Sequence, residues 1–377
     1  MHARQLLPIG IAALALSAPA LAGDGGAESA SDLPRLLSAS RGATFYVAQN
    51  GSDSSPGTRS RPWRTVQKAL RTLRPGQRAL VRRGTYAQDH VVERAGTPSA
   101  PITIAAYPRE RVVLRAGSSS GDTYPIRITS GAAYVRVKGF VIEGAKGTSS
   151  TNVYFEGRAH HVELSRNEIR LSQDQGVFAE ASTRNLLIVG NRIHDNGRGH
   201  VSGQHQSHGL YIEGRDHLIA NNVVHDHPHG FGIQIYPDNE GTIVVSNTIV
   251  GSGHSGIVVG GDDGVGNITI RNNVIAFNSR YGVQMDSDCP TGPVTIDRNV
   301  IHGNRSGAVQ GGCSRVSTSG GNIFSDPRFV SRSGKNFQLA PGSPAINKAR
   351  GDFSLRTDAR GRKRPRGGGY DVGAYER

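Results

Sequence analysis

The stretch 191–213, NRIHDNGRGHVSGQHQSHGLYIE, contains one unit of a repeat that decides the fold. Its first residue is an asparagine in the motif apolar-x-apolar followed by Asn-x-Ile/Val. Aligning this motif along the chain places Asn167, Asn191, Asn222, Asn247, Asn273, Asn299 and Asn322 in one column, at intervals of 24, 31, 25, 26, 26 and 23 residues. A fixed period in this range predicts a solenoid, and units made only of strands and turns predict a parallel β-helix. We expect the stacked asparagines to hydrogen-bond amide to amide inside the coils.

A second column consists of a glycine followed by an alternating strand. Its glycines are Gly176, Gly209, Gly232, Gly256, Gly282 and Gly307. In a strand, side chains alternate between the two faces. The residue after each glycine therefore points inward: Val177, Leu210, Ile233, Ile257 and Val283. The second and fourth residues after it point outward, and they form two rows: first Phe178, Tyr211, Gln234, Val258 and Gln284, and then Glu180, Glu213, Tyr236 and Asp286. An outer sheet face of this composition predicts a sugar-binding surface, and the alternative is an ordinary solvated face.

The ends of the chain differ from the repeats. Residues 1–22 predict an export signal, with Arg4, an apolar run from Leu6 to Leu16 and a small-residue cleavage site before Gly23. Residues 23–43 predict a flexible leader. We expect residues 44–377 to form a single domain, with regular coils at about 134–323 and a C-terminal cap segment at 324–377. The protein is therefore expected to be secreted or periplasmic, without membrane insertion, and monomeric.

One helix is predicted near the start of the domain. Apolar residues recur on one face of the segment that follows Pro62, and Pro75-Gly76 ends it. Those residues are Trp63, Val66, Ala69, Leu70 and Leu73. A lone amphipathic helix before a run of strands predicts a cap on the first coil of the solenoid.

Charge and cysteine content limit the partners. The net charge of +14 and the pI near 10.2 favour an anionic partner, which leaves nucleic acid, acidic polysaccharide and anionic cell surfaces. Export argues against nucleic acid, so we expect an acidic polysaccharide. Cys289 and Cys313 are 24 residues apart, one coil, which predicts a disulfide between adjacent coils.

The entry and exit segments resemble those of the right-handed parallel β-helix superfamily, whose best-known members are pectate lyases. The segments are YVAQNGSDSSPGTRSRPWRTVQKAL (46–70), SDPRFV (325–330), FQLAPGSPAINKA (337–349) and GGGYDVGAYE (367–376). The resemblance implies the fold for nearly the whole mature chain, and it implies activity on acidic polysaccharides. We expect a polysaccharide lyase that cleaves a uronate-containing polysaccharide by β-elimination; the alternatives are a uronan C5-epimerase, a glycoside hydrolase and a non-catalytic glycan-binding or cell-surface protein.

The chain departs from the calcium- and lysine-dependent members of this superfamily. Its DDG sequence, within Gly261-Asp262-Asp263-Gly264, lacks the denser acidic cluster of one calcium-dependent branch. No lysine lies between Lys146 and Lys335, so the repeats cannot supply the lysine base of several relatives. The base and the acid of a β-elimination are therefore expected to be histidine and tyrosine.

Histidines concentrate in and after the opening stretch. Eight of the fourteen are His194, His200, His205, His208, His217, His225, His227 and His229. His208 directly precedes the glycine of its strand, and Tyr211 projects outward three residues later, beyond an insert of about six residues. We predict His208 as the base and Tyr211 as the acid, or the reverse. An inert surface pair is the alternative.

Neighbouring coils supply the predicted substrate contacts. His254, Arg280 and Arg305 each lie two positions before a column glycine. The two arginines are natural partners for uronate carboxylates, because a guanidinium group can bind both carboxylate oxygens. The full set of expected substrate-binding residues is His229, Gln234, Tyr236, His254, Arg280, Gln284, Arg305 and Glu213. An alternative for the two arginines is a solvated coil edge.

No cofactor is expected, although a divalent cation is left open. His225-Asp226-His227-Pro228-His229, with His194-Asp195 one coil earlier, offers mixed ligands without a recognised zinc spacing. These pairs equally fit a row of mutually satisfied turn residues. For a hydrolase, two outward carboxylates must flank a sugar ring, and Glu180 with Glu213 is the adjacent pair.

Overall fold

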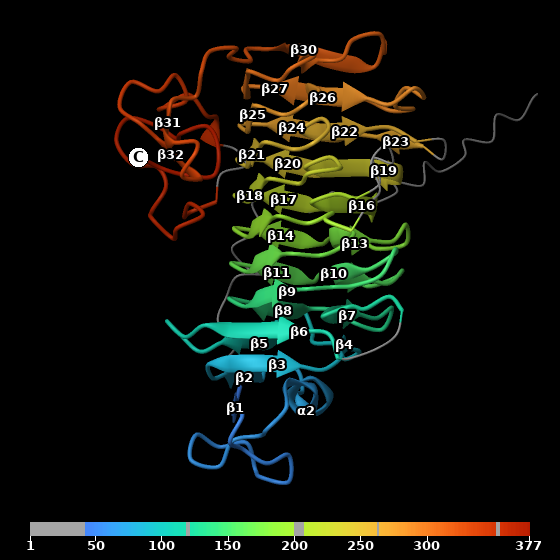
Figure 1. The fold of residues 1–377 in the computed structure, drawn as a ribbon, viewed down its shortest axis with the longest axis vertical. Coiled ribbons are helices and arrows are strands. Elements are labelled where there is room, and N and C mark those ends of the chain that lie inside the picture. The colour runs from blue at the N-terminus through green and yellow to red at the C-terminus, as the bar shows by residue number, and fades with distance from the viewer. Residues whose placement is uncertain (1–41, 118–120, 200–206, 262–263, 352–354) are drawn as a thin grey trace, which may run out of the picture.

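The computed structural model describes residues 42–117, 121–199, 207–261, 264–351 and 355–377. The predicted export signal and nearly all of the predicted leader lie outside these residues. So do most of the predicted insert, with His200 and His205, and Asp262 and Asp263 of the DDG sequence. The described chain is a parallel β-solenoid whose coils are stacked along one axis, as Figure 1 shows. The predicted fold class is confirmed.

Three parallel sheets form the walls of the solenoid. Sheet A contains β1 (Thr44–Val47), β2 (Arg78–Val81), β5 (Ile102–Ala106), β8 (Val135–Lys138), β11 (Glu163–Ser165), β14 (Leu187–Val189), β17 (Leu218–Ala220), β20 (Ile243–Val245), β24 (Ile268–Arg271), β27 (Val294–Asp297) and β30 (Val316–Gly320). Sheet B contains β3 (Gly84–Ala87), β6 (Val112–Arg115), β9 (Val141–Glu143), β12 (Glu168–Arg170), β15 (Arg192–His194), β18 (Val223–His225), β21 (Thr248–Val250), β25 (Val274–Ala276) and β28 (Val300–His302). Sheet C contains β4 (His90–Val92), β7 (Ile126–Ile128), β10 (Thr151–Phe155), β13 (Gln175–Ala179), β16 (Leu210–Arg215), β19 (Ile233–Glu240), β22 (Ile257–Val259), β26 (Tyr281–Met285) and β29 (Gly307–Val309), and β23 (Val265–Gly266) pairs with β19.

The predicted asparagine column forms the corner between sheets A and B, and its stacking is confirmed. Asn222 Nδ2 donates to Ile188 O at 2.7 Å and to Asn247 Oδ1 at 3.0 Å. Asn222 Oδ1 accepts from the backbone N of Asn191 at 2.9 Å and from its Nδ2 at 3.0 Å. The same pattern links the column from Asn167 to Asn322. The amides thereby satisfy backbone groups of a buried turn, which water cannot reach.

A second polar column, which the sequence analysis missed, forms the corner between sheets B and C. It lies five residues after each asparagine of the first column and contains Ser172, Asn196, His227, Ser252, Asn278 and Asn304. Asn196 Oδ1 accepts from Ser172 N at 3.1 Å, and Asn278 Oδ1 accepts from Ser252 N at 2.9 Å. His227 therefore occupies an interior position that Asn196 holds in the preceding coil and Ser252 in the next.

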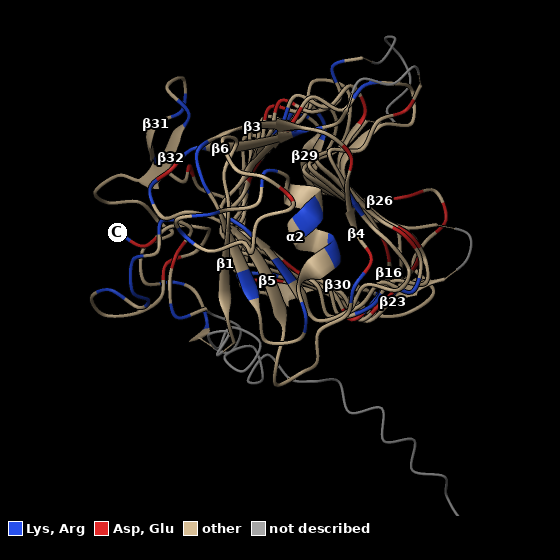
Figure 2. Ribbon diagram, turned by 90° about the horizontal axis from the view of Figure 1, so that it is seen from below, with Lys and Arg blue, Asp and Glu red and all other residues tan. Residues whose placement is uncertain are grey.

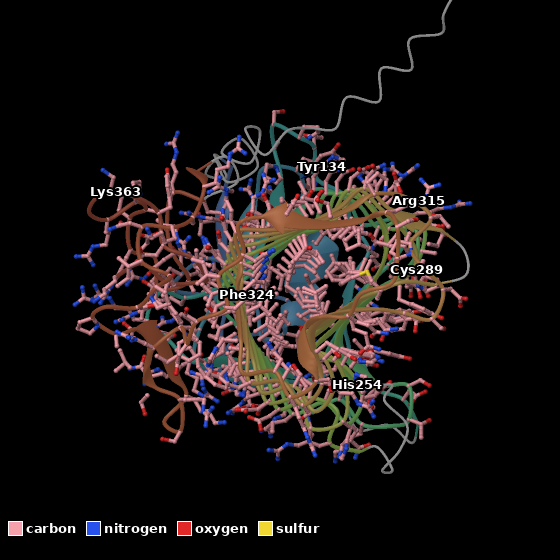
Figure 3. All side chains as sticks on the ribbon, turned by 90° about the horizontal axis from the view of Figure 1, so that it is seen from above. Tyr134, His254, Cys289, Arg315, Phe324 and Lys363 are labelled. Atoms are coloured by element: carbon pink, nitrogen blue, oxygen red, sulfur yellow. A yellow bond between two sulfur atoms is a disulfide. The ribbon has the colours of Figure 1, made fainter. Side chains whose placement is uncertain are left out.

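The core follows the predicted alternation. Val177, Leu210, Ile233, Ile257 and Val283 are fully buried, and side chains fill the interior of the prism in Figure 3. Val258 points to the outer face of β22 as predicted, but its side chain is buried there rather than exposed. The predicted disulfide between Cys289 and Cys313 is present, with Cα atoms 5.5 Å apart, and it joins the loops after β26 and β29.

The predicted N-terminal helix is α2 (Val66–Thr72), capped by the Thr65 side chain, which accepts from Lys68 N at 3.1 Å. It lies across the lower end of the solenoid in Figure 2. The coils start earlier than predicted. All three sheets already contain strands between Arg78 and Val92, where the asparagine motif that marks the later coils is absent.

The predicted C-terminal cap segment does not cover the last turn of the solenoid, because residues 324–351 and 355–377 lie beside the coils (Figure 1). This segment contains the antiparallel pair β31 (Phe329–Ser331) and β32 (Asn336–Leu339). Its Leu355 packs on Leu187 and Leu218 of sheet A, and Thr357 O accepts from Asn221 Nδ2 at 2.7 Å. Apolar residues on the outer faces of sheets A and B are buried by this segment. Among the described residues, no helix has the length and apolar character needed to cross a membrane.

Candidate functional site

An open depression of about 420 Å³ lies on the outer face of sheet C, where four of the predicted site residues meet. It is lined by Thr148, Ser149, Asp174, Gln175, His208, Tyr211, Phe231, Gln234, Tyr236, Val258 and Asp286. Parallel register places Tyr211 beside Gln234, and Gln234 beside Val258, on successive coils. The predicted outward row is therefore the floor of the depression. Among the described residues, its lining contains no lysine or arginine.

His208 is held from both sides by its own column. Its backbone N donates to Gln175 Oε1 at 2.9 Å, and its Nδ1 accepts from the backbone N of Phe231 at 3.1 Å. Gln175, His208 and Phe231 each directly precede a column glycine, so they stack on consecutive coils. Because Nδ1 uses its lone pair for the Phe231 N–H, the neutral ring carries its hydrogen on Nε2. In this arrangement His208 is a donor at Nε2, which disfavours it as the base.

Tyr211 ends a row of aromatic rings along sheet C. Ring centroids are 5.0 Å apart for Tyr124 and Tyr154, 5.6 Å for Tyr154 and Phe178, and 5.0 Å for Phe178 and Tyr211. The His208 ring is nearly perpendicular to the Tyr211 ring, and their centroids are 5.8 Å apart. A row of this kind offers apolar faces to successive sugar rings, and it leads to the depression.

Glu213 is the second outward residue of β16 and lies on the same face as Tyr211. Partial burial raises the pKa of its carboxyl from 4.5 to about 7, and the charges of Glu180 and Asp238 add to the increase. The Ala181 N–H and the Tyr211 hydroxyl donate to this carboxylate and oppose the increase in its pKa. Burial and the Glu213 charge also raise the pKa of Tyr211 well above its usual range. The two side chains therefore form a phenol–carboxylate pair beside the depression.

The backbone around Glu213 is irregular in a way that positions its side chain. The register of β16 against β19 shifts between Ile212 and Gly214, so β19 has extra residues opposite Glu213. His217 Nε2 faces Glu213 O at 2.8 Å, and His217 Nδ1 accepts from Leu186 N at 3.1 Å. Complete burial lowers the pKa of His217 to about 4. A neutral, buried histidine thereby fixes the main chain at Glu213.

The other predicted contacts lie farther along sheet C. His254 is buried and packs against Phe231, with ring centroids 4.5 Å apart, and Gln284 Oε1 accepts from Ser255 Oγ at 2.6 Å. His229, Arg280 and Arg305 do not line the depression. In the column two positions before the glycine, Arg280 lies three coils beyond Ser207, or about 14 Å along the axis. Arg280 and Arg305 therefore lie on coils beyond that of His208.

Seven lining residues were not among the predicted site residues: Thr148, Ser149, Asp174, Gln175, Phe231, Val258 and Asp286. Gln175 and Phe231 were available from the sequence, because they occupy the same column position as His208. Asp174 shares the column of His254 and Arg280. Aligning the residues one and two positions before each column glycine would have identified Gln175, Phe231 and Asp174 as neighbours of His208.

The histidine–aspartate pairs of the metal alternative lie on the outer face of sheet B, away from the depression. The His194 and His225 rings stack with centroids 4.8 Å apart, and each Nδ1 lies within 2.8 Å of its following aspartate. Arg192 Nε donates to His225 Nε2 at 3.1 Å, so both nitrogens of His225 are already used. Among the described residues, no group of three or more histidine, cysteine, aspartate or glutamate side chains could hold a metal ion. The geometry fits the row of mutually satisfied turn residues.

Comparison with known proteins agrees with this architecture. Residues 45–198 match the family described as Pel9A-like, right handed beta helix region, and residues 151–329 match the family described as right handed beta helix region. Together the two family models match residues 45–329, and the chain is a parallel β-solenoid. These findings confirm the expected resemblance to right-handed parallel β-helix proteins.

Two curated proteins match parts of this chain. An uncharacterised Bacillus subtilis protein, YwoF, is 29% identical over 34% of this chain and 29% of its own length. The pectate lyase PEL9 of Emericella nidulans is 33% identical over 21% of this chain and 20% of its own length. The chain thus spans less than a third of the length of either relative.

Solved β-helix structures align over much more of the chain. Pectate lyase Pel9A covers 93% of this chain and 99% of its own, with a TM-score of 0.66 and 18% identity. An alginate lyase from a Paenibacillus species covers 69% of this chain and 95% of its own, with a TM-score of 0.52 and 21% identity. A glycoside hydrolase covers 75% and 96%, with a TM-score of 0.53 and 10% identity. At these identities the likeness establishes the β-helix fold.

Proposed function

We propose that the protein is a secreted polysaccharide lyase that cleaves a uronate-containing polysaccharide by β-elimination on the outer face of sheet C. The observation that carries this proposal is that His208 and Tyr211 line one open depression at the end of an aromatic row, with the Glu213 carboxylate hydrogen-bonded to Tyr211 beside it. The basic net charge and the disulfide support an exported protein with an anionic substrate. The fold shared with pectate and alginate lyases is a supporting analogy.

Tyr211 and Glu213 carry the proton transfers in this proposal. The Tyr211 oxygen takes the proton from C5 of the uronate while the phenol proton moves to the Glu213 carboxylate. The bond from C4 to the glycosidic oxygen breaks, and a double bond forms between C4 and C5. Tyr211 then gives the proton from C5 to the leaving oxygen and recovers its own proton from Glu213. Both side chains end in their starting states, so the cycle is balanced. The sequence predicted His208 as base and Tyr211 as acid, or the reverse; in this proposal Tyr211 is both base and acid, and His208 binds the substrate carboxylate.

His208 and Gln234 serve the substrate. The Nε2–H of His208 donates to the uronate carboxylate, which stabilises the charge that develops when C5 loses its proton. Gln234 Oε1 is buried and has no hydrogen-bond partner among the described residues, so it accepts from a sugar hydroxyl. Tyr236 lines the same depression, and Arg280 and Arg305 bind carboxylates of more distant sugar units.

The experiment that tests the proposal is product analysis on a panel of uronate polymers. A lyase yields fragments that contain a double bond and lack one water relative to hydrolysis products. An epimerase exchanges the C5 proton with solvent and leaves the chain length unchanged. If every polymer of the panel gave saturated fragments or no fragments, the lyase assignment would be wrong. Adding a chelator to the active reaction tests separately whether a divalent cation takes part.

Glycoside hydrolysis is the second candidate, and one observation favours it. Glu180 and Glu213 are adjacent on consecutive coils of sheet C, and the Glu180 charge contributes to the raised pKa of Glu213. Hydrolases use such a protonated and ionised carboxyl pair. Glu180, however, already accepts from the Tyr154 hydroxyl and from Gly157 N, which fixes it away from a sugar. This bonding is the reason that we place the hydrolase second.

A further inference from the structure

A second depression, of about 610 Å³, lies on the outer face of sheet A. Strands β2, β5, β8 and β11 and the turn 107–110 form it. Sheets A and C are different walls of the solenoid, and Figure 2 shows β5 and β26 on different sides of it. Nothing in the proposed elimination uses this face. Its volume falls within the range of ordinary small-molecule sites.

The charges of this depression are unbalanced. Its two carboxylates already have cationic partners: Glu110 accepts from Arg82 Nη2 at 2.7 Å, and Glu163 lies 3.0 Å from Arg136 Nε. The lining also contains Arg78, whose Nε donates to Thr44 Oγ1 at 2.7 Å, and Arg109, Lys138 and Arg166. The side chains of Arg109, Lys138 and Arg166 make no hydrogen bond or ion pair with another residue that the structure describes. Three cationic groups therefore face one hollow in which both carboxylates are already paired with other arginines.

The cations repel one another at close range. Partial burial lowers the pKa of Lys138, and the charge of Arg166 lowers it further. An anion bound between the two groups would relieve both effects, because it replaces lost hydration and offsets the repulsion. The Glu163 carboxylate, which is paired with Arg136, offsets only part of this lowering of the Lys138 pKa.

The floor and the walls suit a sugar ring. Leu80, Ala105 and Ala106 form an apolar floor, and Tyr107 forms part of the wall, with the Arg82 guanidinium stacked 4.6 Å from its ring centroid. An apolar floor with a few charged groups at its rim is typical of binding sites for small polar ligands. A pyranose places its C–H face on such a floor while its carboxylate reaches the rim.

The C-terminal segment bounds this depression at one end. On the same outer face, Leu355 covers the coils of β14 and β17, which lie immediately beyond β11. At the boundary, a Cβ built on Gly361 would lie 3.7 Å from the Arg166 guanidinium. The uncovered part of sheet A is thus a limited hollow rather than an open sheet face.

We propose that this depression is a second binding site for one uronate unit of an acidic polysaccharide, with Lys138 and Arg166 as carboxylate partners and Arg109 at the rim. The choice of ligand rests on the function proposed above, whereas the anion site rests on the residues of sheet A. Held here, a long polymer stays near the enzyme while sheet C acts on another part of it. A short oligomer cannot occupy both faces at once.

The test is calorimetric titration of the full chain carrying Tyr211→Phe with tetragalacturonate, tetramannuronate, a neutral cello-oligosaccharide of equal length and inorganic phosphate. The site variant is Lys138→Gln with Arg166→Gln. The matched control is Lys363→Gln with Arg366→Gln, which removes the same charge from exposed positions of the C-terminal segment. Circular dichroism and the unfolding midpoint of each variant verify folding.

We expect one of the uronates to bind, the neutral oligomer not to bind at this site, and the site variant to weaken uronate binding at least about tenfold at one class of sites. The control should leave the isotherm unchanged. Equal isotherms for the site variant and the control would overturn the proposal. Binding of phosphate without any uronate would overturn the uronate assignment.

Elimination assays on wild-type protein separate the two proposals. If the polymers are cleaved but Lys138 and Arg166 do not affect uronate binding, the sheet A site is wrong and the proposed function stands. If no polymer is cleaved but the site variant loses uronate binding, the function is wrong and the sheet A site stands. When both hold, the site variant should raise KM for long polymer and leave kcat and the KM for short oligomers unchanged.

Discussion

Replacing Glu213 by glutamine should remove the pH dependence of the reaction. In the proposed cycle Glu213 must be ionised, and the pKa of its carboxyl is raised to about 7 by burial and by neighbouring carboxylates. For one ionisation at that pKa, kcat/KM at pH 5.5 should be roughly thirtyfold below its high-pH plateau. Glu213→Gln should lower the plateau by about two to four orders of magnitude and abolish the acidic limb. The assay is initial rate against pH on the polymer that the panel identifies.

Asp238→Asn provides the matched control for this titration. The exposed Asp238 carboxylate contributes to the raised pKa of Glu213 without being part of the proposed chemistry. Removing its charge should therefore move the acidic limb to lower pH and keep the plateau. A flat wild-type profile between pH 5 and 8, or an unchanged limb in Glu213→Gln, would refute the assigned role.

The pH dependence of folding stability tests the raised pKa of Glu213 independently of activity. Its folded-state pKa lies above the unfolded value, so the folded protein loses stability as the pH rises from about 4.5 through about 7. Glu213→Gln should accordingly be more stable than wild type at pH 8, by about 1 kcal/mol after allowance for solvent screening. The two proteins should have similar stability at pH 4. Urea midpoints at both pH values measure this difference.

Three further outcomes follow from named contacts. Tyr211→Phe should lower kcat by about two to four orders of magnitude with folding intact, whereas retained turnover would move the base elsewhere. Asn222→Ala removes four side-chain hydrogen bonds and should lower the free energy of unfolding in urea by about 4 kcal/mol. The control is Asn221→Gly, which removes one hydrogen bond to Thr357 O and should cost about 1 kcal/mol. Equal losses for the two variants would contradict the role of the asparagine column. Burial lowers the pKa of His217 to about 4 and of His227 to about 3, below the unfolded value, so stability should fall by about 2 kcal/mol per histidine as the pH drops from 6.5 to 5. His217→Gln should reduce this loss, and a urea midpoint that is unchanged over this range would show that the burial is wrong.

The fold was predictable because each coil repeats the same local rule. Asn222 has to satisfy backbone groups of a buried turn, and only a residue with both a donor and an acceptor does this in every coil. The spacing of such residues is therefore visible in one sequence. The path of the C-terminal segment was not predictable, because Leu355 packs on a sheet face far from it in the chain, and no repeat encodes that contact.

The candidate site was predictable in its columns and less so in its chemistry. Alternation along β16 places Tyr211 and Glu213 on one face, and the glycine column brings Gln234 and Tyr236 beside them. The donor role of His208 depends on the N–H of Phe231 in the next coil, which a sequence pattern does not reveal. The raised pKa of Glu213 arises from burial at a register shift. His227 shows the converse, because a histidine that resembled a metal ligand in the sequence belongs to the interior of the solenoid.

The central claim is that sheet C performs β-elimination on a uronate polymer. The most direct measurement is the ultraviolet absorbance of the new double bond during incubation of wild-type and Tyr211→Phe proteins with polygalacturonate and alginate. We predict a steady increase in absorbance with wild type on at least one of these polymers, and almost none with Tyr211→Phe. Equal rates for the two proteins, or no increase with wild type on either polymer, would contradict the account.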